Sequence, residues 1–385
     1  MRITARIANW LENRWVAPAY SGLVLAAVAL CFFGAAINTM SGWLYVLSGL
    51  SFALLGMAAF LSARSLLGLS VRRHHIQPVS AGDELTIELE LENQTTQPKT
   101  LLQVQDLLPF VLGKSVQTPI EVIPPHESYR WIYYYPTQRR GVYRWQTVEL
   151  RTATPLGLFW CRRRRDATAT AIVYPTVLPL TSCPLVDELR QKDSAQFYSQ
   201  DRRLQSATEG LTRSLRPYRA GDPTRLIHWR SSARYGELRV RELEVITGGQ
   251  EIVICLDNAA TWQSEDFEQA VIAAASLYFY AHRKQLNVKL WTGGTDLVQG
   301  EDVVLGALAA TEPGEEALAN NAPPICPLIW LTQNPLSLST LPPGSRWVLW
   351  PTVSSPQPEI LLNRVLGLLI QTDQPLQLQL QKPLT

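Results

Sequence analysis

Cysteine is scarce in this chain of 385 residues, and its five cysteines are scattered with no CxxC pair. They are Cys31, Cys161, Cys183, Cys255 and Cys326. Such spacing, without nearby histidines, argues against a disulfide framework and against structural zinc. The sequence also lacks a P-loop, a GxSxG element, an HExxH element and a GxGxxG turn between a strand and a helix. It therefore carries none of the common nucleotide-binding or hydrolase motifs.

An excess of charge is missing too. The 35 Lys+Arg and 33 Asp+Glu leave a net charge of +2, which excludes a globally basic nucleic-acid binder. No charged residue occurs in the 49 residues from Trp15 to Ala63. This run divides at residues 38–42 into two apolar segments, near Pro18–Ile37 and Trp43–Ala63, each long enough to cross a bilayer. They predict a transmembrane hairpin over residues 1–69 that stays attached, unlike a cleaved signal peptide.

Arginines on either side of the two apolar segments predict the orientation of the hairpin. The loop between the segments has no charge, so the positive-inside rule places both termini in the cytoplasm and the protein in the plasma (inner) membrane. The spans hold no ionisable residue, which favours an anchor over a transporter or channel. The flanking arginines are Arg2, Arg6, Arg14, Arg64, Arg72 and Arg73.

Residues 70–175 predict an antiparallel β-sandwich-like domain. The run from Leu85 to Asn93 alternates apolar and polar residues at period two, as a strand with one buried face does. Other strand-like runs follow at 100–105, 127–136, 141–151 and 169–173, and no helical period interrupts them. A basic block, Arg162, Arg163, Arg164 and Arg165, has two interpretations: contact with anionic lipid headgroups, or an exposed hairpin tip kept soluble by charge. Nucleic acid is not expected as its partner.

The rest of the chain predicts a connector over 176–245 and an α/β domain over 246–385. The connector begins with a Pro-, Ser- and Gln-rich stretch. In the α/β domain, apolar strands at 252–256, 286–291, 327–331 and 346–350 alternate with helical stretches at 264–284 and 303–310, which predicts a parallel sheet with covering helices. Residues 360–385 have no clear pattern.

The most distinctive segment runs from Ser214 to Glu244. Its basic residues are all arginine, which suits bidentate pairing with carboxylates or phosphates. Asp222 followed by Pro223 predicts a helix N-cap and first turn, and Tyr235-Gly236 predicts the end of that helix before a strand at 238–243. The arginines are Arg216, Arg219, Arg225, Arg230, Arg234, Arg239 and Arg241.

This segment resembles the RxYxxGDxxRxIxWxxxAxxxxLxVxExE signature of domain-of-unknown-function family 58. The residues that carry the resemblance are Arg216, Tyr218, Gly221, Asp222, Arg225, His228, Trp229 and Arg230. Arg140-Gly-Val-Tyr143 and Thr154-Pro-Leu-Gly-Leu-Phe159 resemble two further elements of the family, although Thr154 stands where the family usually has Asp. The resemblance implies a membrane-anchored bacterial protein associated with a MoxR-type AAA+ ATPase.

The resemblance also implies that the α/β domain is a von Willebrand factor A-like, doubly wound sheet, in which a DxSxS motif binds Mg²⁺. Here Asp257 and Thr261 keep the first and last positions, while Ala259 replaces the middle Ser. Because one hydroxyl ligand is missing, a degenerate and empty site is favoured over an occupied one. No other cofactor is expected. The expected fold class is therefore α+β and multidomain: transmembrane hairpin, β-sandwich-like domain, and von Willebrand factor A-like domain.

Two functions from different classes follow. The leading one is a non-enzymatic, membrane-anchored adaptor whose arginine-rich segment contacts a protein partner or clamps the junction between domains. The alternative is a hydrolase or anion-binding enzyme that uses His228, Asp222 and the neighbouring arginines. A structural hydrogen bond is the favoured role of His228, because no carboxylate partner is fixed by the sequence.

Overall fold

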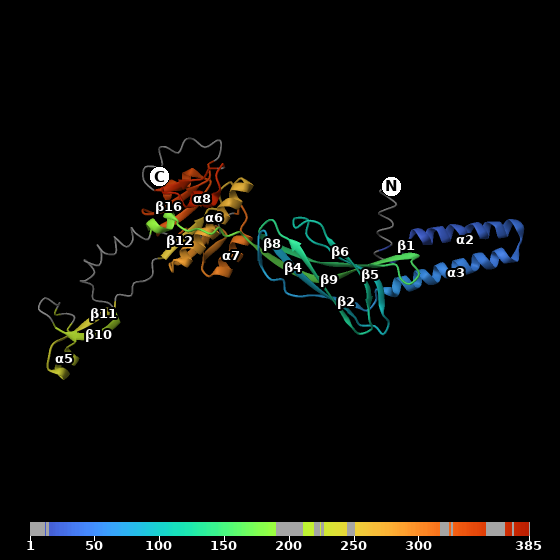
Figure 1. Cartoon of the computed structure of the whole chain (residues 1–385), viewed down its shortest axis with the longest axis horizontal. Helices are drawn as coiled ribbons and strands as arrows, with labels where there is room; N and C mark the ends of the chain where they lie inside the picture. The colour runs from blue at the N-terminus through green and yellow to red at the C-terminus, as the bar shows by residue number, and fades with distance from the viewer. Residues whose placement is uncertain are drawn as a thin grey trace. The chain divides into compact units, whose positions relative to one another are not determined.

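A computed structural model describes residues 12, 15–189, 211–218, 224, 227–244, 251–315, 323–324, 326–351, 366–371 and 373–384. The fold mixes helices and sheets and divides into two compact units, Met1–Tyr174 and Pro175–Thr385. The first unit contains two long helices and two β-sheets, and the second contains a six-stranded sheet and a separate two-stranded sheet (Figure 1).

The two apolar segments form the helices α2 (Tyr20–Thr39) and α3 (Gly42–Ser65), as predicted. Both are long and apolar enough to cross a membrane. Only 17% and 11% of their most apolar windows are buried within the protein, whereas the core helix of a soluble protein is mostly buried. Apolar surface of this extent is typical of a segment that lipid or a partner covers.

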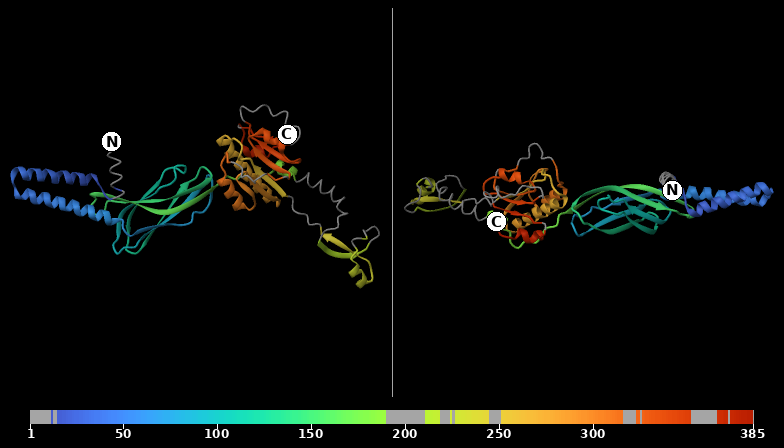
Figure 2. Two further views of the ribbon diagram at one scale, coloured as in Figure 1. Left: turned by 180° about the vertical axis from the view of Figure 1, so that it is seen from behind. Right: turned by 90° about the horizontal axis from the view of Figure 1, so that it is seen from above.

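The β part of the first unit consists of two sheets around one core. The strands of this part lie together (Figures 1 and 2). One sheet has the order β1-β9-β8-β5-β6, with β3 beside β9, and the other has the order β2-β4-β7. Strand β4 buries one face in this core, through the fully buried side chains of Leu85, Ile87, Leu89 and Leu91. This confirms the prediction of a strand with one buried face. The strands are β1 (Ala17–Pro18), β2 (Leu69–Arg73), β3 (Val79–Ser80), β4 (Glu84–Asn93), β5 (Lys99–Asp106), β6 (Val116–Ile123), β7 (Ser128–Pro136), β8 (Gly141–Thr152) and β9 (Phe159–Tyr174).

A charged group lies at the centre of this core. The Asp106 carboxylate accepts two hydrogen bonds from the Arg73 guanidinium, at 2.5 and 2.9 Å, and both side chains are buried. The same carboxylate accepts from the Tyr133 hydroxyl at 2.6 Å and from Trp145 Nε1 at 3.0 Å. Arg73 Nε donates to Ala167 O at 3.1 Å. The ion pair thus connects β2, β5, β7, β8 and β9 across the sandwich.

The second unit contains the predicted α/β sheet, with the order β14-β13-β12-β15-β16-β17. All its neighbouring pairs are parallel except β13 with the edge strand β14. The elements are β12 (Glu251–Leu256), α6 (Ser264–Arg283), β13 (Asn287–Thr292), β14 (Thr295–Val298), α7 (Glu301–Ala310), β15 (Leu328–Thr332), the 3-10 helix η2 (Pro335–Thr340), β16 (Arg346–Leu349), β17 (Gly367–Leu369) and α8 (Leu376–Leu380). The last two lie in the stretch that had no clear pattern.

The two faces of this sheet are covered differently. Ile252, Ile254 and Leu256 pack with α6 and α7 on one face. Val253 and Cys255 face the other way, in a smaller cluster with three tryptophans and Leu338 of η2. Segments cover both faces, and in the described part of the chain the long helices lie on one of them.

The start of the predicted connector differs from expectation. Leu180, Cys183, Leu185, Val186 and Leu189 are buried in the core beside α6. This segment is also fixed by polar contacts, since the Tyr280 hydroxyl donates to the Asp187 carboxylate at 2.9 Å. Residues 177–189 therefore belong to the α/β core. Their apolar side chains are spaced by prolines and polar residues, which hid them in the sequence pattern.

Candidate functional sites

The described parts of the arginine-rich segment form a small module, a two-stranded sheet with a short helix. Strands β10 (Leu211–Pro217) and β11 (Arg239–Glu244) pair antiparallel, and the helix α5 (Trp229–Tyr235) precedes β11. Arg216 lies opposite Val240 in the ladder, and the Tyr218 N–H donates to Leu238 O at 2.8 Å. Gly221, Asp222 and Arg225 lie outside the described residues, as do Pro223 and Arg219.

His228 is the N-cap of α5. Its Nδ1 accepts from the Ser231 N–H at 3.2 Å and lies 2.8 Å from Ser231 Oγ. The backbone N–H of His228 donates to Arg239 O at 2.8 Å. The ring thus makes a structural hydrogen bond, since a cap satisfies a backbone donor that the first turn leaves free. The helix ends at Tyr235 as predicted, with Gly236 at φ 71° in the left-handed C-cap position.

The capping role predicts how substitutions of His228 behave. His228→Ala removes the acceptor and costs the helix about 1 kcal/mol, whereas His228→Asn keeps an acceptor and stays close to the wild type. Amide hydrogen exchange at Ser231 and Ser232 measures the difference. If the amides exchange as fast in His228→Asn as in His228→Ala, the His228 ring does not act as a helix cap.

Around α5 the module presents aromatic and basic side chains to solvent. Trp229 is 66% exposed, and Tyr235 and Leu238 are exposed as well. Arg230 is also exposed. Arg239 is held within the module instead, because its guanidinium lies 4.1 Å from the Tyr235 ring centroid and 2.9 Å from the Glu237 carboxylate. Exposed tryptophan, tyrosine and arginine on a small folded module are the residue types that dominate protein interfaces.

A second polar cluster lies at the carboxyl ends of β12 and β15. These adjacent strands are the point where the strand order reverses, the usual place for a ligand in an open α/β sheet. Asp257 follows β12, and its carboxylate accepts from the Thr332 hydroxyl at 2.7 Å. Asn258 is buried and binds the Gly293 N–H and the Glu315 carboxylate. The sequence analysis identified Asp257 but not Asn258 or Thr332. Their positions in the sequence, just after a predicted strand and at the end of another, could have indicated them.

The cluster does not make up a magnesium site. Ala259 offers no side-chain oxygen, and Thr261 is exposed. In the described ranges of the chain, no group of three or more His, Cys, Asp or Glu side chains is placed to hold a metal ion. Mg²⁺ favours near-octahedral oxygen ligation from carboxylates and water, and the donors at this edge fall short of that set.

Burial raises the pKa of Asp257 above its ordinary 3.8, and the Thr332 hydroxyl and the Ala260 N–H lower it less strongly. The folded state therefore holds the Asp257 proton more tightly than the unfolded state does, and ionisation of Asp257 opposes folding. Asp257→Asn should raise the unfolding free energy at neutral pH, and the gain should shrink as the pH falls through the folded pKa toward 3.8. Denaturant unfolding at several pH values tests this, and an equal gain at every pH would contradict it.

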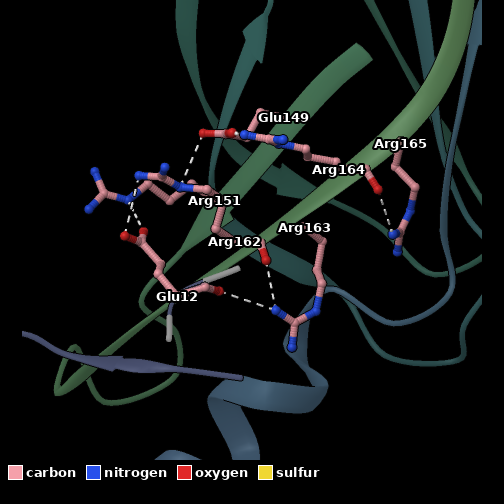
Figure 3. A network of polar contacts seen from close by, with 7 residues as sticks. All are labelled: Glu12, Glu149, Arg151, Arg162, Arg163, Arg164 and Arg165. Carbon is pink, nitrogen blue, oxygen red and sulfur yellow. Dashed lines mark hydrogen bonds and ion pairs between the residues drawn. The ribbon is translucent and has the colours of Figure 1, made fainter. Parts of the chain in front are cut away.

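The basic block Arg162–Arg165 lies within β9, paired with Arg151–Val148 of β8. The hairpin-tip reading is therefore wrong, because the strand continues on both sides of the block. Two carboxylates neutralise part of it (Figure 3). Glu12 pairs with Arg151 at 2.5 Å and Arg162 at 3.3 Å. Glu149 pairs with Arg162 at 3.1 Å and Arg164 at 3.5 Å.

Two arginines of the block hold the ends of the apolar helices. Arg163 Nη2 donates to Trp15 O at 3.1 Å, just before α2. Arg165 donates to Leu66 O at 3.0 Å and Leu69 O at 2.9 Å, just after α3. Arg164 has a side chain that is 59% exposed. The lipid contact predicted for the whole block thus remains a prediction, with Arg164 the member best placed for it.

Comparison with known proteins bears on the arginine-rich segment. Residues 214–299 match the family model "Protein of unknown function DUF58". The chain is 23% identical over 272 residues to the uncharacterized protein YeaD of Bacillus subtilis (strain 168), a match that covers 69% of this chain and 66% of YeaD. The match thus spans slightly less than two thirds of that relative.

Two solved structures resemble parts of the chain weakly. The CARDB domain of PF1109 from Pyrococcus furiosus is 13% identical with a TM-score of 0.20, over 26% of this chain and 94% of that one. BslA, a bacterial hydrophobin, is 12% identical with a TM-score of 0.17, over 26% and 95%. Likenesses this low carry no argument about fold or function. The family model and YeaD support the resemblance predicted from the arginine-rich segment: over residues 214–299 this chain is similar to the DUF58 family.

Proposed function

We propose that this chain is a membrane-anchored adaptor without enzymatic activity. In this proposal α2 and α3 span the plasma membrane with both termini in the cytoplasm, and the sandwich and a von Willebrand factor A-like α/β domain lie on the cytoplasmic side. The alternation of strands and helices and the strand order of the α/β sheet support that fold assignment. The lack of charge in α2 and the arginines that flank the hairpin support the topology.

One observation carries the adaptor role: the module around α5 exposes Trp229, Tyr235 and Arg230 on a folded support. Aromatic rings and arginines buried at an interface contribute much of its binding energy. The partner proposed from the family resemblance is a MoxR-type AAA+ ATPase. The hydrolase alternative would have to use Nε2 of His228, because Nδ1 serves as the helix cap.

Crosslinking in native membranes tests the proposal. Full-length protein is captured after mild crosslinking, and partners are identified by mass spectrometry. Trp229→Ala/Arg230→Ala should abolish enrichment of an AAA+ ATPase. The matched control is Phe110→Ala/Lys114→Ala, which removes an exposed aromatic and an exposed cation from the sandwich instead, and it should leave enrichment unchanged.

The other outcomes separate the alternatives. Enrichment that survives in Trp229→Ala/Arg230→Ala places docking elsewhere in the chain, with the Asp257 edge of the sheet as the next candidate. Absence of any specific partner argues against an adaptor. A stability gain on adding inorganic phosphate, lost in Arg230→Ala, would instead support the anion-binding alternative.

A further inference from the structure

The loop between β8 and β9, residues 153–158, is bound to both apolar helices. The Ala19 N–H donates to Leu158 O at 2.9 Å, and Ser21 Oγ donates to Gly157 O at 2.8 Å. On the other helix, Ser62 Oγ donates to Thr154 O at 3.0 Å. Carbonyl groups of the loop therefore accept hydrogen bonds from hydroxyl and amide groups of the helical hairpin. The depth of the helices in a membrane consequently fixes the depth of the loop.

Helix length sets that depth. The 20 residues of α2 extend about 30 Å, which matches the hydrocarbon thickness of about 30 Å. Ser21 is the second residue of this helix, so it lies at the edge of the hydrocarbon. The 24 residues of α3 extend about 36 Å, a few ångströms more than the hydrocarbon needs. Ser62, three residues before the end of α3, therefore lies at the same edge.

The chemistry of the loop suits that layer. No charged residue occurs from Ala153 to Cys161. Leu156 is 46% exposed, and Pro155 and Gly157 are exposed on either side of it. Trp15 and Tyr20, at the same end of α2, are exposed as well, and aromatic side chains of this kind collect at the boundary between lipid and water. The charged residues of β9 begin only at Arg162, beyond the loop.

We infer that the β8–β9 loop is a third membrane element, which inserts Pro155 and Leu156 into the interfacial layer of the bilayer beside α2 and α3. The occupant of this apolar surface is lipid, because the loop hydrogen-bonds both spans at one level and continues their exposed apolar surface. The inference depends on the proposed membrane anchor. It gives the sandwich a fixed distance and orientation at the membrane, which a flexible linker would not.

Depth-dependent fluorescence quenching tests the inference in the full-length protein. A nitrobenzoxadiazole label is attached at Leu156→Cys, at Gln138→Cys or at the native Cys31. Gln138 is the exposed control in the β7–β8 turn, separated from the loop by the 12 residues of β8, about 40 Å. Cys31 is removed by Cys31→Ala in the first two variants, and Cys326→Ala is present in all three. The thiols of Cys161, Cys183 and Cys255 are buried, and burial raises the pKa of each, so they react poorly with the label.

Each protein is placed in nanodiscs of phosphatidylcholine and phosphatidylglycerol that carry nitroxide lipids, spin-labelled near the headgroup or near the chain end. We expect the label at 156 to be quenched several-fold more by the shallow nitroxide than the label at 138, and the label at Cys31 to be quenched most by the deep one. Quenching at 156 no greater than at 138, with Cys31 quenched, overturns the loop insertion and leaves the anchor standing. Loss of deep quenching at Cys31 overturns the anchor itself and the inference with it.

Discussion

Replacing Asp106 with alanine should destabilise the β-sandwich by about 3–5 kcal/mol, the cost of removing one member of a buried ion pair. The Arg73 and Asp106 side chains are 1% and 0% exposed, so the variant leaves the Arg73 charge buried without its carboxylate. The buried Tyr133 hydroxyl and Trp145 indole N–H lose their acceptor in the same step. Thermal unfolding of the detergent-solubilised full-length protein measures the effect as a large drop in the midpoint of the sandwich transition.

Two variants show whether charge burial is the cause. Asp106→Asn keeps a hydrogen-bond acceptor but not the charge. We therefore expect its unfolding midpoint to lie between those of the wild type and Asp106→Ala. Glu88→Gln weakens the ion pair between Glu88 and Arg130, whose side chains are 20% and 66% exposed, so solvent screens the pair and the midpoint should change little. Equal midpoints for Asp106→Ala and Glu88→Gln would rule out a central role for the buried pair. Burial and the Asp106 charge raise the pKa of Tyr133 well above its ordinary value, so its hydroxyl remains a donor throughout.

Much of the fold could be predicted from the sequence because the spacing of apolar residues indicates which face of a strand or helix is buried. The alternation in β4 and the apolar run in β12 each identified a strand and the faces that it buries. The charge-free run identified α2 and α3 within two residues of their bounds. The spacing of apolar residues did not predict the burial of residues 177–189, because these residues pack into the α/β core with no regular repeat.

The candidate sites were less predictable because their partners are distant in sequence. The block Arg162–Arg165 reads locally as free positive charge, yet its carboxylate partner Glu12 lies 150 residues away from Arg162. Asp106 sits within an ordinary strand pattern, and nothing in that pattern shows that Arg73 faces it across the core. The helix start predicted at Asp222-Pro223 lies outside the described residues, and the described helix α5 begins at Trp229 after His228. Local propensity favours Asp, Asn, Ser or Thr as a cap, so nothing in the sequence pointed to His228, whose Nδ1 accepts from the Ser231 N–H.

The second large effect is expected at Gly22, on the first turn of α2. A Cβ built on Gly22 would lie far inside van der Waals contact with the carbonyl oxygen of Leu158 in the β8–β9 loop. A backbone carbonyl cannot turn aside as a flexible side chain can, so Gly22→Ala must push the loop and the helix apart. Overpacking of this kind costs about 1–3 kcal/mol, and the Ser21–Gly157 hydrogen bond should be lost with it.

Gly34→Ala is the matched control, because it makes the same substitution in the same helix with no other atom within 4 Å of the new Cβ. It should leave the thermal midpoint unchanged or raise it slightly, since alanine favours the helix over glycine. Gly22→Ala should lower the midpoint and also reduce quenching of a label at position 156 by shallow nitroxide lipids, because the loop loses its fixed depth. If both glycine variants unfold alike and quench alike, contact between the loop and α2 does not hold the sandwich at the membrane. That role then falls to the Ser62–Thr154 hydrogen bond of α3 and to the arginines that bind Trp15, Leu66 and Leu69.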